Sequence, residues 1–443
     1  MKTCDIIGIS DNRQQWFAPE VMNVIQGGHV FSGGRRHHEI VAPLLPSDAV
    51  WLDITVPLES VFKQYEAVEH VVIFASGDPL FYGFANTVQR KCKGVVMRVF
   101  PSFNSLQLLA HRLLLPYHDM RIVSLTGRPW QEFDRALIEQ ATKVGILTDR
   151  EHTPSAIARR MLEYGYTHYQ MHVGEHLGNP DKERISTLTL EEAAKQEFAM
   201  PNCVILEGNS SLPTREGGGR VFSTFGLPDS SFALLDGRAK MITKMPIRLL
   251  TLQALDLTHR HTLWDIGACT GSVSIEARLL FPHLHVVAFE IRPECEAIIR
   301  ENARRHGAPG IEVRMGDFLK DPPPALPCRE GAVTKQDLSS PSATKVSAPS
   351  LQGRGGGGSS PDAIFIGGHG GRLKEIMAKV LQYLAPDGVI VMNSVVAPKV
   401  TTDSHRLWDE ACAELGLRQE PPMRIQLNDN HPITILKAHN SKS

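Results

Sequence analysis

Acidic residues at the ends of apolar runs mark a place for ligand chemistry in the second half of the sequence. The stretch HTLWDIGACTGSVS (residues 261–274) predicts a strand ending near Asp265, a turn with Gly267 and Gly271, and a helix over residues 272–280. Glycines let the backbone close up on a ligand beside a helix N-terminus. Glu290 ends the next apolar run, where a carboxylate can accept hydrogen bonds from both hydroxyls of a ribose.

Two further runs end in residues that suit the same ligand. The third apolar run is followed by GDF (residues 316–318), which contains Asp317. The fourth apolar run is followed by GGHGG (residues 367–371), which begins with Gly367. Ligands of open α/β sheets bind outside the carboxyl ends of the strands, so these residues are expected to converge. The sequence therefore predicts a small-molecule site at that edge of a sheet.

This pattern resembles the class I S-adenosylmethionine-dependent methyltransferases. The resemblance implies S-adenosylmethionine as cofactor, with its methionine part on the first loop, its ribose on Glu290 and its adenine on Asp317. Cys269 departs from the pattern, since the family usually has glycine there. An NAD-type dinucleotide fold and glycines that serve only packing are the alternatives. The expected cofactor-binding residues of this half are Asp265, Gly267, Gly271, Glu290, Asp317 and Gly367.

In the first half, ASGDPLFYG (residues 75–83) follows an apolar run, and Gly-Asp-Pro by itself is only a good turn. With SGGRRHH (residues 32–38), PSFNSLQ (residues 101–107) and VSLTGRP (residues 123–129), it resembles the tetrapyrrole methylases, in the branch acting at C-5 of precorrin-6Y. The resemblance spans nearly all of residues 1–207 and implies two α/β subdomains that clasp S-adenosylmethionine. The cofactor-binding residues that it implies are Gly77, Asp78, Pro79, Leu80, Ser102, Ser105 and Thr126.

The stretch DGRAKMITKMPIR (residues 236–248) resembles the beginning of the decarboxylating C-15 methyltransferases of the same pathway. The two halves in this order resemble the fused family that converts precorrin-6Y, or its cobalt form, to precorrin-8X in cobalamin biosynthesis. That family methylates C-5 and C-15 and removes the carboxylate of the C-12 acetate. A nucleic-acid methyltransferase and a catalytically decayed S-adenosylmethionine-binding protein are the alternatives.

A corrin precursor carries many carboxylates, for which basic side chains are suitable donors. Methyl transfer needs a ring carbon held in line with the sulfonium methyl, so positioning supplies most of the catalysis. Lys244 and His369 are the candidates for the proton relay that decarboxylation needs. His37 and His38 have no third ligand at metal spacing, so no metal site is expected. The expected substrate-binding residues, about half of which are alternatively solvated surface charges, are Arg35, Arg36, His37, Arg128, Arg238, Lys240 and Arg248.

Strand-sized runs alternate with helical patterns along both halves, which predicts an α/β fold. We expect a tetrapyrrole-methylase domain over residues 1–208, a Gly- and Ser-rich linker over 209–232 and a second domain over 233–443. The second domain is predicted to be Rossmann-like, with a seven-stranded doubly wound sheet that ends in an antiparallel hairpin. A segment without periodicity, residues 323–360, is predicted to be a disordered insertion.

Bulk properties limit the partners. The 443 residues are 42% hydrophobic and 21% charged, which is typical of globular domains. The net charge of -1 gives no general attraction to nucleic acid or to a membrane, and no apolar run approaches the roughly 18 residues of a membrane span. The N-terminus lacks the apolar core of a secretory signal, so we expect a cytoplasmic protein. The family resemblance implies a tetrapyrrole substrate and a homo-oligomer.

Overall fold

A computed structural model describes residues 1–208, 225–321, 360–395, 404–427 and 432–440. The chain forms two compact units, Met1–Val221 and Phe222–Ser443. The division falls inside the predicted linker, and the predicted insertion lies outside the described residues except for Ser360.

The first unit begins with a fully parallel sheet of five strands in the order β3-β2-β4-β1-β5. Helices α3 and α4 pack on one face through Val61, Tyr65 and Val88, while α1 and α2 pack on the other through Ile25 and Val41. Both faces are covered, so a central strand such as β4 is apolar over almost its whole length. The elements are β1 (Thr3–Ile9), α1 (Pro19–Gln26), β2 (Val30–Gly33), α2 (Arg35–Val41), β3 (Val50–Asp53), α3 (Leu58–Glu66), β4 (His70–Ser76), α4 (Phe84–Lys91) and β5 (Val96–Phe100).

A mixed sheet of five strands in the order β6-β7-β10-β8-β9 completes the first unit. Only β6 and β7 are parallel, and the other neighbours are antiparallel. The two α/β subdomains implied by the resemblance are therefore confirmed. The elements are α5 (Ser105–Leu113), β6 (Arg121–Ser124), α6 (Gln131–Ile138), β7 (Lys143–Leu147), α7 (Pro154–Glu163), β8 (Tyr169–Glu175), β9 (Arg184–Leu188), α8 (Leu190–Ala193) and β10 (Asn202–Gly208).

The second unit is built on a sheet in the order β13-β12-β11-β14-β15-β18-β16, with β17 paired to β18. The first five strands of that order are parallel and β18 is antiparallel to its neighbours. The described residues thus hold eight strands where seven were predicted, because β16 is a two-residue strand without a sequence pattern. The strands are β11 (Thr262–Ile266), β12 (His285–Glu290), β13 (Ile311–Met315), β14 (Ala363–Ile366), β15 (Val389–Val395), β16 (Arg418–Gln419), β17 (Met423–Ile425) and β18 (Ile433–His439).

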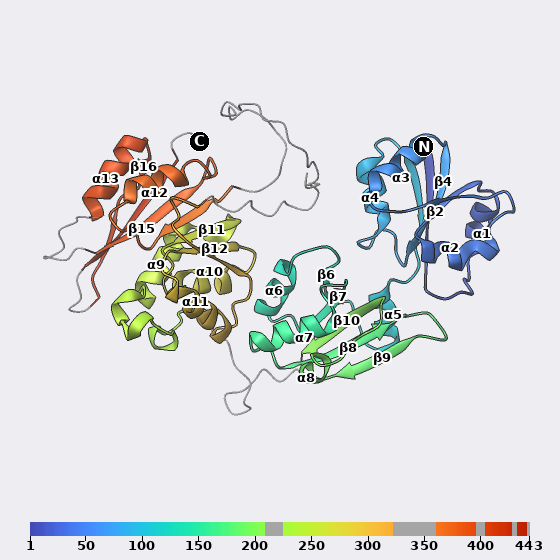
Figure 1. Cartoon of the computed structure of the whole chain (residues 1–443), viewed down its shortest axis with the longest axis horizontal. Helices are drawn as coiled ribbons and strands as arrows, with labels where there is room; N and C mark the ends of the chain where they lie inside the picture. Colours follow the sequence, from blue (N-terminus) through green and yellow to red (C-terminus); the bar gives the residue numbers. More distant parts are fainter. Residues whose placement is uncertain (209–224, 322–359, 396–403, 428–431, 441–443) are drawn as a thin grey trace. The chain divides into compact units, whose positions relative to one another are not determined.

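Helices cover both faces of this sheet (Figure 1). Trp408 of α13 and Met377 of α12 pack with Trp264 on one face, whereas Leu255 of α9 and Val273 of α10 pack with Leu263 on the other. This doubly wound arrangement leaves the carboxyl ends of β11 to β14 free to form a site. The helices are α9 (Met245–Leu255), α10 (Ser272–Leu280), α11 (Glu294–Arg305), α12 (Leu373–Val380) and α13 (Ser404–Leu415). Short 3-10 helices of this unit span Asp229–Ser231, Leu235–Gly237, Ala239–Met241 and Leu257–His259, and one in the first unit spans Ala42–Leu44.

Residues 225–232 were expected to be linker, but they pack on the second unit. Leu227 and Phe232 are both buried, and the backbone of this stretch is hydrogen-bonded to side chains of α10 and α11. Glycine-rich composition ends before this point, so apolar side chains here can join a core.

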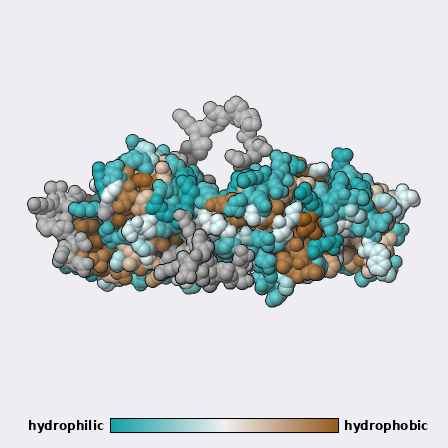
Figure 2. Space-filling view, turned by 90° about the horizontal axis from the view of Figure 1, so that it is seen from below, coloured by the Kyte–Doolittle hydropathy of each residue, from teal (hydrophilic) through white to brown (hydrophobic). Residues whose placement is uncertain are grey.

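On the face drawn in Figure 2, hydrophilic residues predominate and hydrophobic areas are smaller. No helix of the described ranges is long and apolar enough to cross a membrane.

Candidate active sites

A cavity of about 840 Å³ lies at the carboxyl ends of the parallel strands in the second unit. Its wall combines the loops after β11, β12, β13 and β14 with residues 240–244 and with parts of β15, β17 and β18. The topology brings these loops together because neighbouring parallel strands end at one edge of a sheet. The cavity is lined by the predicted residues Asp265, Gly267, Glu290, Asp317, Gly367, Lys240, Lys244 and His369.

The loop after β11 depends on close backbone packing. Gly267 has φ +80°, and a Cβ there would lie 2.8 Å from the Gly368 nitrogen, so only glycine fits. Gly271, at φ +72°, does not line the cavity. A Cβ on it would meet Ile299 at 2.9 Å, so it serves the packing of α10 on α11 and its predicted contact with a cofactor is not supported.

Cys269 takes the place of the usual glycine in a left-handed conformation, with φ +52°. Its backbone N–H donates to Glu290 Oε2 at 2.8 Å, which ties the loop after β11 to the end of β12. The thiol is buried beside Cys295 and Leu235, and burial raises its pKa. Cys269 therefore shapes the loop as a neutral, packed side chain.

Glu290 is buried at the end of β12 and carries a dense set of hydrogen bonds. Arg292 donates to it through Nε (2.9 Å to Oε1) and Nη2 (2.8 Å to Oε2), and the backbone nitrogens of Ile291 and Arg292 donate to Oε1. Burial raises the pKa of Glu290, but these donors outweigh it and the pKa lies below its usual range. The carboxylate is therefore charged and fixed on the cavity wall. Sequence reasoning missed Arg292, whose type alone carried no signal.

Asp265 lies fully buried at the end of β11 beneath the cavity. Its Oδ2 accepts hydrogen bonds from the Ser274 N–H (3.2 Å) and hydroxyl (2.6 Å), whereas Oδ1 has no partner among the described residues. Burial raises the pKa of Asp265 to about 6. An unsatisfied buried oxygen is unfavourable by itself, so this atom is suited to a donor on a bound ligand.

Asp265→Asn is expected to stabilise the second unit at neutral pH. Because the folded-state pKa is about 6 against an ordinary value of 3.8, the carboxylate destabilises the folded state increasingly as pH rises through that window. We expect the variant to gain on the order of 1–3 kcal/mol at pH 7 and to lose this advantage near pH 4. Thermal unfolding across this pH range measures it. An advantage of the same size at both pH values would contradict the assignment.

Asp317 and His369 complete the cavity rim. Asp317 accepts hydrogen bonds from the Leu319 N–H (3.0 Å) and from Arg372 Nη1 (3.1 Å). Both donors lower the pKa of Asp317, and the Leu319 N–H has the larger effect. His369 Nδ1 accepts from the Gly371 N–H at 3.1 Å, and burial lowers its pKa, so the ring is neutral near pH 7. Arg372, which the sequence did not single out, adds a cation to this rim.

Two predicted substrate-binding arginines do not line the cavity. Arg238 is exposed and pairs with Asp236. Arg248 is fully buried and pairs with Glu276, so it does not reach a substrate carboxylate, and its predicted role was wrong. The sequence showed several basic residues that could bind substrate carboxylates. Only the structure shows that Lys240 and Lys244 line the cavity and that Arg238 and Arg248 do not.

The first unit holds a second cavity of about 530 Å³, lined by residues of both subdomains. Gly77, Ser105 and Thr126 line it as predicted. Asp78 does not line it: its carboxylate accepts from the Leu80 N–H at 2.9 Å, which closes the turn after β4. Pro79, Leu80 and Ser102 also lie off the wall, so the structure does not bring them to this cavity.

Arg36 and His37 lie on the wall of this cavity at the start of α2. Ser76 Oγ accepts from Arg36 Nη2 at 2.9 Å and lies 2.9 Å from His37 Nε2. Burial lowers the pKa of His37 to about 4, so this imidazole is neutral near pH 7. Asp11, which sequence reasoning missed, pairs with Arg36 at 3.2 Å from the loop after β1.

Arg35 and Arg128, the other predicted substrate-binding residues of this unit, lie off the wall. Arg35 is exposed and pairs with Glu39. The Arg128 guanidinium lies 5.1 Å from the ring centre of Tyr82, a residue of the wall, and donates to Ser124 Oγ. Arg128 therefore contacts Tyr82 of the cavity wall without lining the cavity itself. No group of three His, Cys, Asp or Glu side chains in the described parts could hold a metal ion.

Comparison with known proteins finds a family model for each unit and relatives that span both units. The family of tetrapyrrole (corrin/porphyrin) methylases matches residues 2–194, and a precorrin methyltransferase domain matches residues 236–323. A precorrin-6Y C(5,15)-methyltransferase [decarboxylating] of Sinorhizobium sp is 30% identical over 93% of this chain and 88% of its own length. Its counterpart from Mycobacterium tuberculosis strain H37Rv is 29% identical over 70% of this chain and 75% of its own length. The structure titled precorrin-6y C5,15-methyltransferase from Geobacter metallireducens GS-15 is 28% identical, covers 50% of this chain and 100% of its own, and has a TM-score of 0.37.

The two matches define a methyltransferase in which a tetrapyrrole methylase domain precedes a precorrin methyltransferase domain. The chain belongs to the family of decarboxylating precorrin-6Y C(5,15)-methyltransferases. The resemblance inferred from the sequence motifs is thereby confirmed.

Proposed function

We propose that the protein methylates precorrin-6Y, or its cobalt form, at C-5 in the first unit and at C-15 in the second, with loss of carbon dioxide from the C-12 acetate, giving precorrin-8X. The family assignment supports the substrate, and the names of related single-domain proteins support the division of labour. One relative is a cobalt-precorrin-7 C(5)-methyltransferase of Salmonella typhimurium, and another is a cobalt-precorrin-6B C(15)-methyltransferase (decarboxylating) of the same organism.

The observation that carries the proposal for the second unit is the donor and acceptor set of its cavity. S-adenosylmethionine needs acceptors for its amino group and ribose hydroxyls, and it supplies an activated methyl on a sulfonium. Asp265 Oδ1 is a buried acceptor without a partner among the described residues, and Glu290 is a fixed carboxylate at the end of β12. Asp317 and the close-packed backbone at Gly267 and Gly367 complete the set. These residues fit the cofactor.

The rest of that cavity suits the tetrapyrrole. Ile242, Ile247, Val395, Ile425 and Ile433 give it an apolar wall against which a macrocycle can pack. Lys240 and Lys244 stand on the same wall and suit its carboxylates. The protein's task is then to hold the acceptor carbon in line with the methyl and to keep water out.

Decarboxylation needs one proton besides an electron sink. When the bond to the carboxylate breaks, its electron pair passes into the conjugated ring, carbon dioxide leaves, and a proton finally replaces it on the acetate carbon. The Lys244 ammonium and the His369 ring both lie on the wall and are the two candidates. The ammonium can donate a proton directly, whereas the neutral His369 ring can only pass on a proton that it first takes up. Asp229 holds Lys244 at 3.6 Å, and Ser404 holds His369 at 3.2 Å.

Lys244→Met and His369→Gln separate these two candidates. Removal of the true donor is expected to slow decarboxylation about 100-fold, within the range of general acid catalysis. Single-turnover release of labelled carbon dioxide measures the step. If both variants decarboxylate at the wild-type rate, neither residue relays the proton.

For the first unit we propose S-adenosylmethionine binding along Gly77, Ser105 and Thr126. Ser105 begins α5, whose first turn is fixed by reciprocal hydrogen bonds between Asn104 and Gln107. Arg36 and His37 enter the same cavity from α2 and suit the carboxylates of the ring. A cytoplasmic location and a homo-oligomeric state remain predictions, and sedimentation of the purified protein measures the second.

The deciding experiment incubates the purified protein with S-adenosylmethionine and precorrin-6Y, with and without cobalt in the ring, and follows the product mass. Two added methyl groups and one lost carbon dioxide support the whole proposal. One methyl without decarboxylation would mean that the second unit is inactive. An unchanged mass with both forms of the substrate would overturn the substrate assignment, and binding of S-adenosylmethionine without turnover would then favour a decayed binding protein.

A further inference from the structure

Residues 240–244, just before α9, form part of the wall of the second unit's cavity, and we call residues 226–244 the wall segment. This segment holds only short 3-10 helices, so its own backbone hydrogen bonds do little to keep it in place. Residues 240–244 of the segment nevertheless line the cavity and carry both of its lysines. Something outside the segment must therefore hold it.

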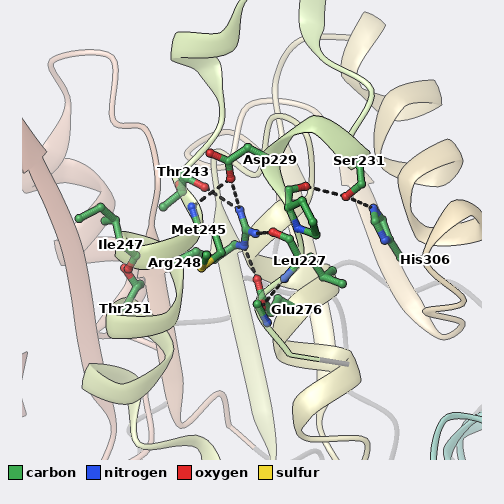
Figure 3. A network of polar contacts seen from close by, with 12 residues as sticks. Leu227, Asp229, Ser231, Thr243, Met245, Ile247, Arg248, Thr251, Glu276 and His306 are labelled. Atoms are coloured by element: carbon green, nitrogen blue, oxygen red, sulfur yellow. Dashed lines mark hydrogen bonds and ion pairs between the residues drawn. The ribbon is translucent and has the colours of Figure 1, made fainter. Parts of the chain in front are cut away.

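Arg248 in the first turn of α9 is one such anchor (Figure 3). Its guanidinium donates to the backbone oxygens of Leu227 and Thr243, at 2.7 Å in the second case, so it joins the two ends of the wall segment. Nε donates to Glu276 Oε2, and Nη1 lies 3.3 Å from Asp229 Oδ1. The guanidinium is fully buried, and its fork matches partners on three sides.

Glu276 on α10 holds the same segment from below. Its Oε1 accepts from the Gly226 N–H at 2.6 Å and from the Leu227 N–H at 3.1 Å, while Oε2 is occupied by Arg248. The side chain is fully buried. Each polar atom of the pair is therefore satisfied by the partner or by the backbone of the wall segment.

Two further side chains extend this network. Asp229 Oδ1 accepts from the Met245 N–H at 3.0 Å, and its Oδ2 lies 3.6 Å from Lys244 Nζ. Asn302 of α11 exchanges hydrogen bonds with the backbone of Ala233 (2.7 and 3.0 Å) and also donates to the Thr270 oxygen at 2.9 Å. The wall segment is thus fastened before and after residues 240–244, and once to the loop that follows β11.

A buried ion pair is a weak source of stability, because desolvation of both charges offsets their attraction. A pair of apolar side chains of similar volume would stabilise the folded state at least as much. What the Arg248–Glu276 pair does in addition is to bind four backbone groups at defined places in a segment that has little regular structure. Its role is therefore best sought in position rather than in stability.

We propose that Arg248 and Glu276 are positioning residues for the C-15 reaction, since they hold the wall segment so that Lys240 and Lys244 face the substrate side of the cavity. The proposal rests on the proposed function of the second unit. The sequence had indicated direct contact of Arg248 with the substrate. Positioning of the wall segment replaces that role.

The test compares Arg248→Lys with Arg278→Lys in the full-length protein. Arg278 is also fully buried, and its guanidinium binds the backbone oxygens of Pro282, Leu284 and Pro309, none of which lines the cavity. Both changes keep the charge and lose the fork. We expect Arg248→Lys to lower kcat/KM for the C-15 step about 100-fold, as expected for a misplaced wall, with an unchanged dissociation constant for S-adenosylmethionine. Arg278→Lys should leave both quantities near wild type below its unfolding temperature.

Hydrogen exchange gives a readout that does not depend on the substrate. The amides of Gly226, Leu227 and Met245 should exchange faster in Arg248→Lys and in Glu276→Gln, whereas the amides of β11 should not. If both arginine variants impair the C-15 step equally, or if these amides keep their protection, the positioning role is wrong. If the wild type itself fails to turn over precorrin-6Y, the proposed function fails while the exchange data still decide the anchoring.

Asp229→Ala covers the case in which Arg248→Lys does not fold. Asp229 is partly exposed, and the buried Arg248 keeps its pair with Glu276 when Asp229 is removed, so no buried charge is left unpaired. The change frees the Met245 N–H and the Lys244 ammonium. We expect the C-15 step to slow about 10-fold without a change in cofactor affinity, following the same misplacement argument. A wild-type rate together with faster exchange at Met245 would show that the position of this segment does not matter for the reaction.

Discussion

Glu290→Ala is expected to weaken cofactor binding by the second unit about 1000-fold and to leave cofactor binding by the first unit unchanged. The variant removes the proposed acceptor for the ribose hydroxyls and leaves the Arg292 guanidinium and the Cys269 N–H without Glu290 as their partner. Hydrogen bonds to a charged group contribute about 1.5–3 kcal/mol each, so the loss of two amounts to about 1000-fold in affinity. Isothermal titration with S-adenosylhomocysteine measures the loss of affinity, and product mass is expected to show a ring that has not lost carbon dioxide.

Glu296→Ala is the matched control for this change. Glu296 lies on α11 a short distance along the chain and makes an exposed ion pair with Arg300 that is worth little. Its removal should change neither cofactor affinity nor product mass. If Glu290→Ala still binds the cofactor in the second unit, the carboxylate is not the ribose acceptor and the inferred binding mode is wrong.

Gly8→Ala has the opposite effect: C-5 methylation is lost while the second unit still methylates and decarboxylates. A Cβ at residue 8 would lie 1.9 Å from the Gly77 oxygen and 2.7 Å from the Ser102 nitrogen, and both are backbone atoms that cannot rotate away. The ends of β1 and β4 must separate, which moves Gly77 on the cavity wall. We expect a loss of about 1000-fold in the C-5 step, because a small displacement of the loop already costs about 100-fold and overpacking adds to it.

Gly94→Ala provides the comparison for this second variant. Gly94 has φ +81°, but no atom lies within 4 Å of the place that a Cβ would take, so alanine there brings only backbone strain of about 1–2 kcal/mol. It should lower the unfolding temperature and leave both reactions in place. Wild-type C-5 methylation by Gly8→Ala would mean that the loop after β4 does not carry the cofactor.

Strong local patterns predicted most of the fold. The helix predicted over residues 272–280 is α10, and the two apolar runs that precede GDF (residues 316–318) and GGHGG (residues 367–371) are the strands β13 and β14. The strands that were missed are short or polar: β2 and β3 have four residues each, and β9 is a polar edge strand. Pairing with neighbours, which no local pattern records, makes these segments strands.

The candidate sites divide in the same way. Glu290 and Asp317 could be found because each follows an apolar run, and a parallel sheet brings such ends together. Arg292 and Arg372, which hold those two carboxylates, could not be found, since an arginine near an acid is ordinary in any sequence. Asp78 stands in a family motif but closes a turn, and only the geometry of the loop shows where its carboxylate points.

The sequence by itself determined the order of the two domains, the class of reaction and the glycines and acids at the strand ends. These features depend on short stretches whose backbone conformation follows from local residue types. Only the tertiary structure decided that Arg248 meets Glu276 across 28 positions of chain and not a substrate carboxylate. The direction of a long charged side chain is set by which buried partners satisfy it, and those partners come together only when distant elements pack.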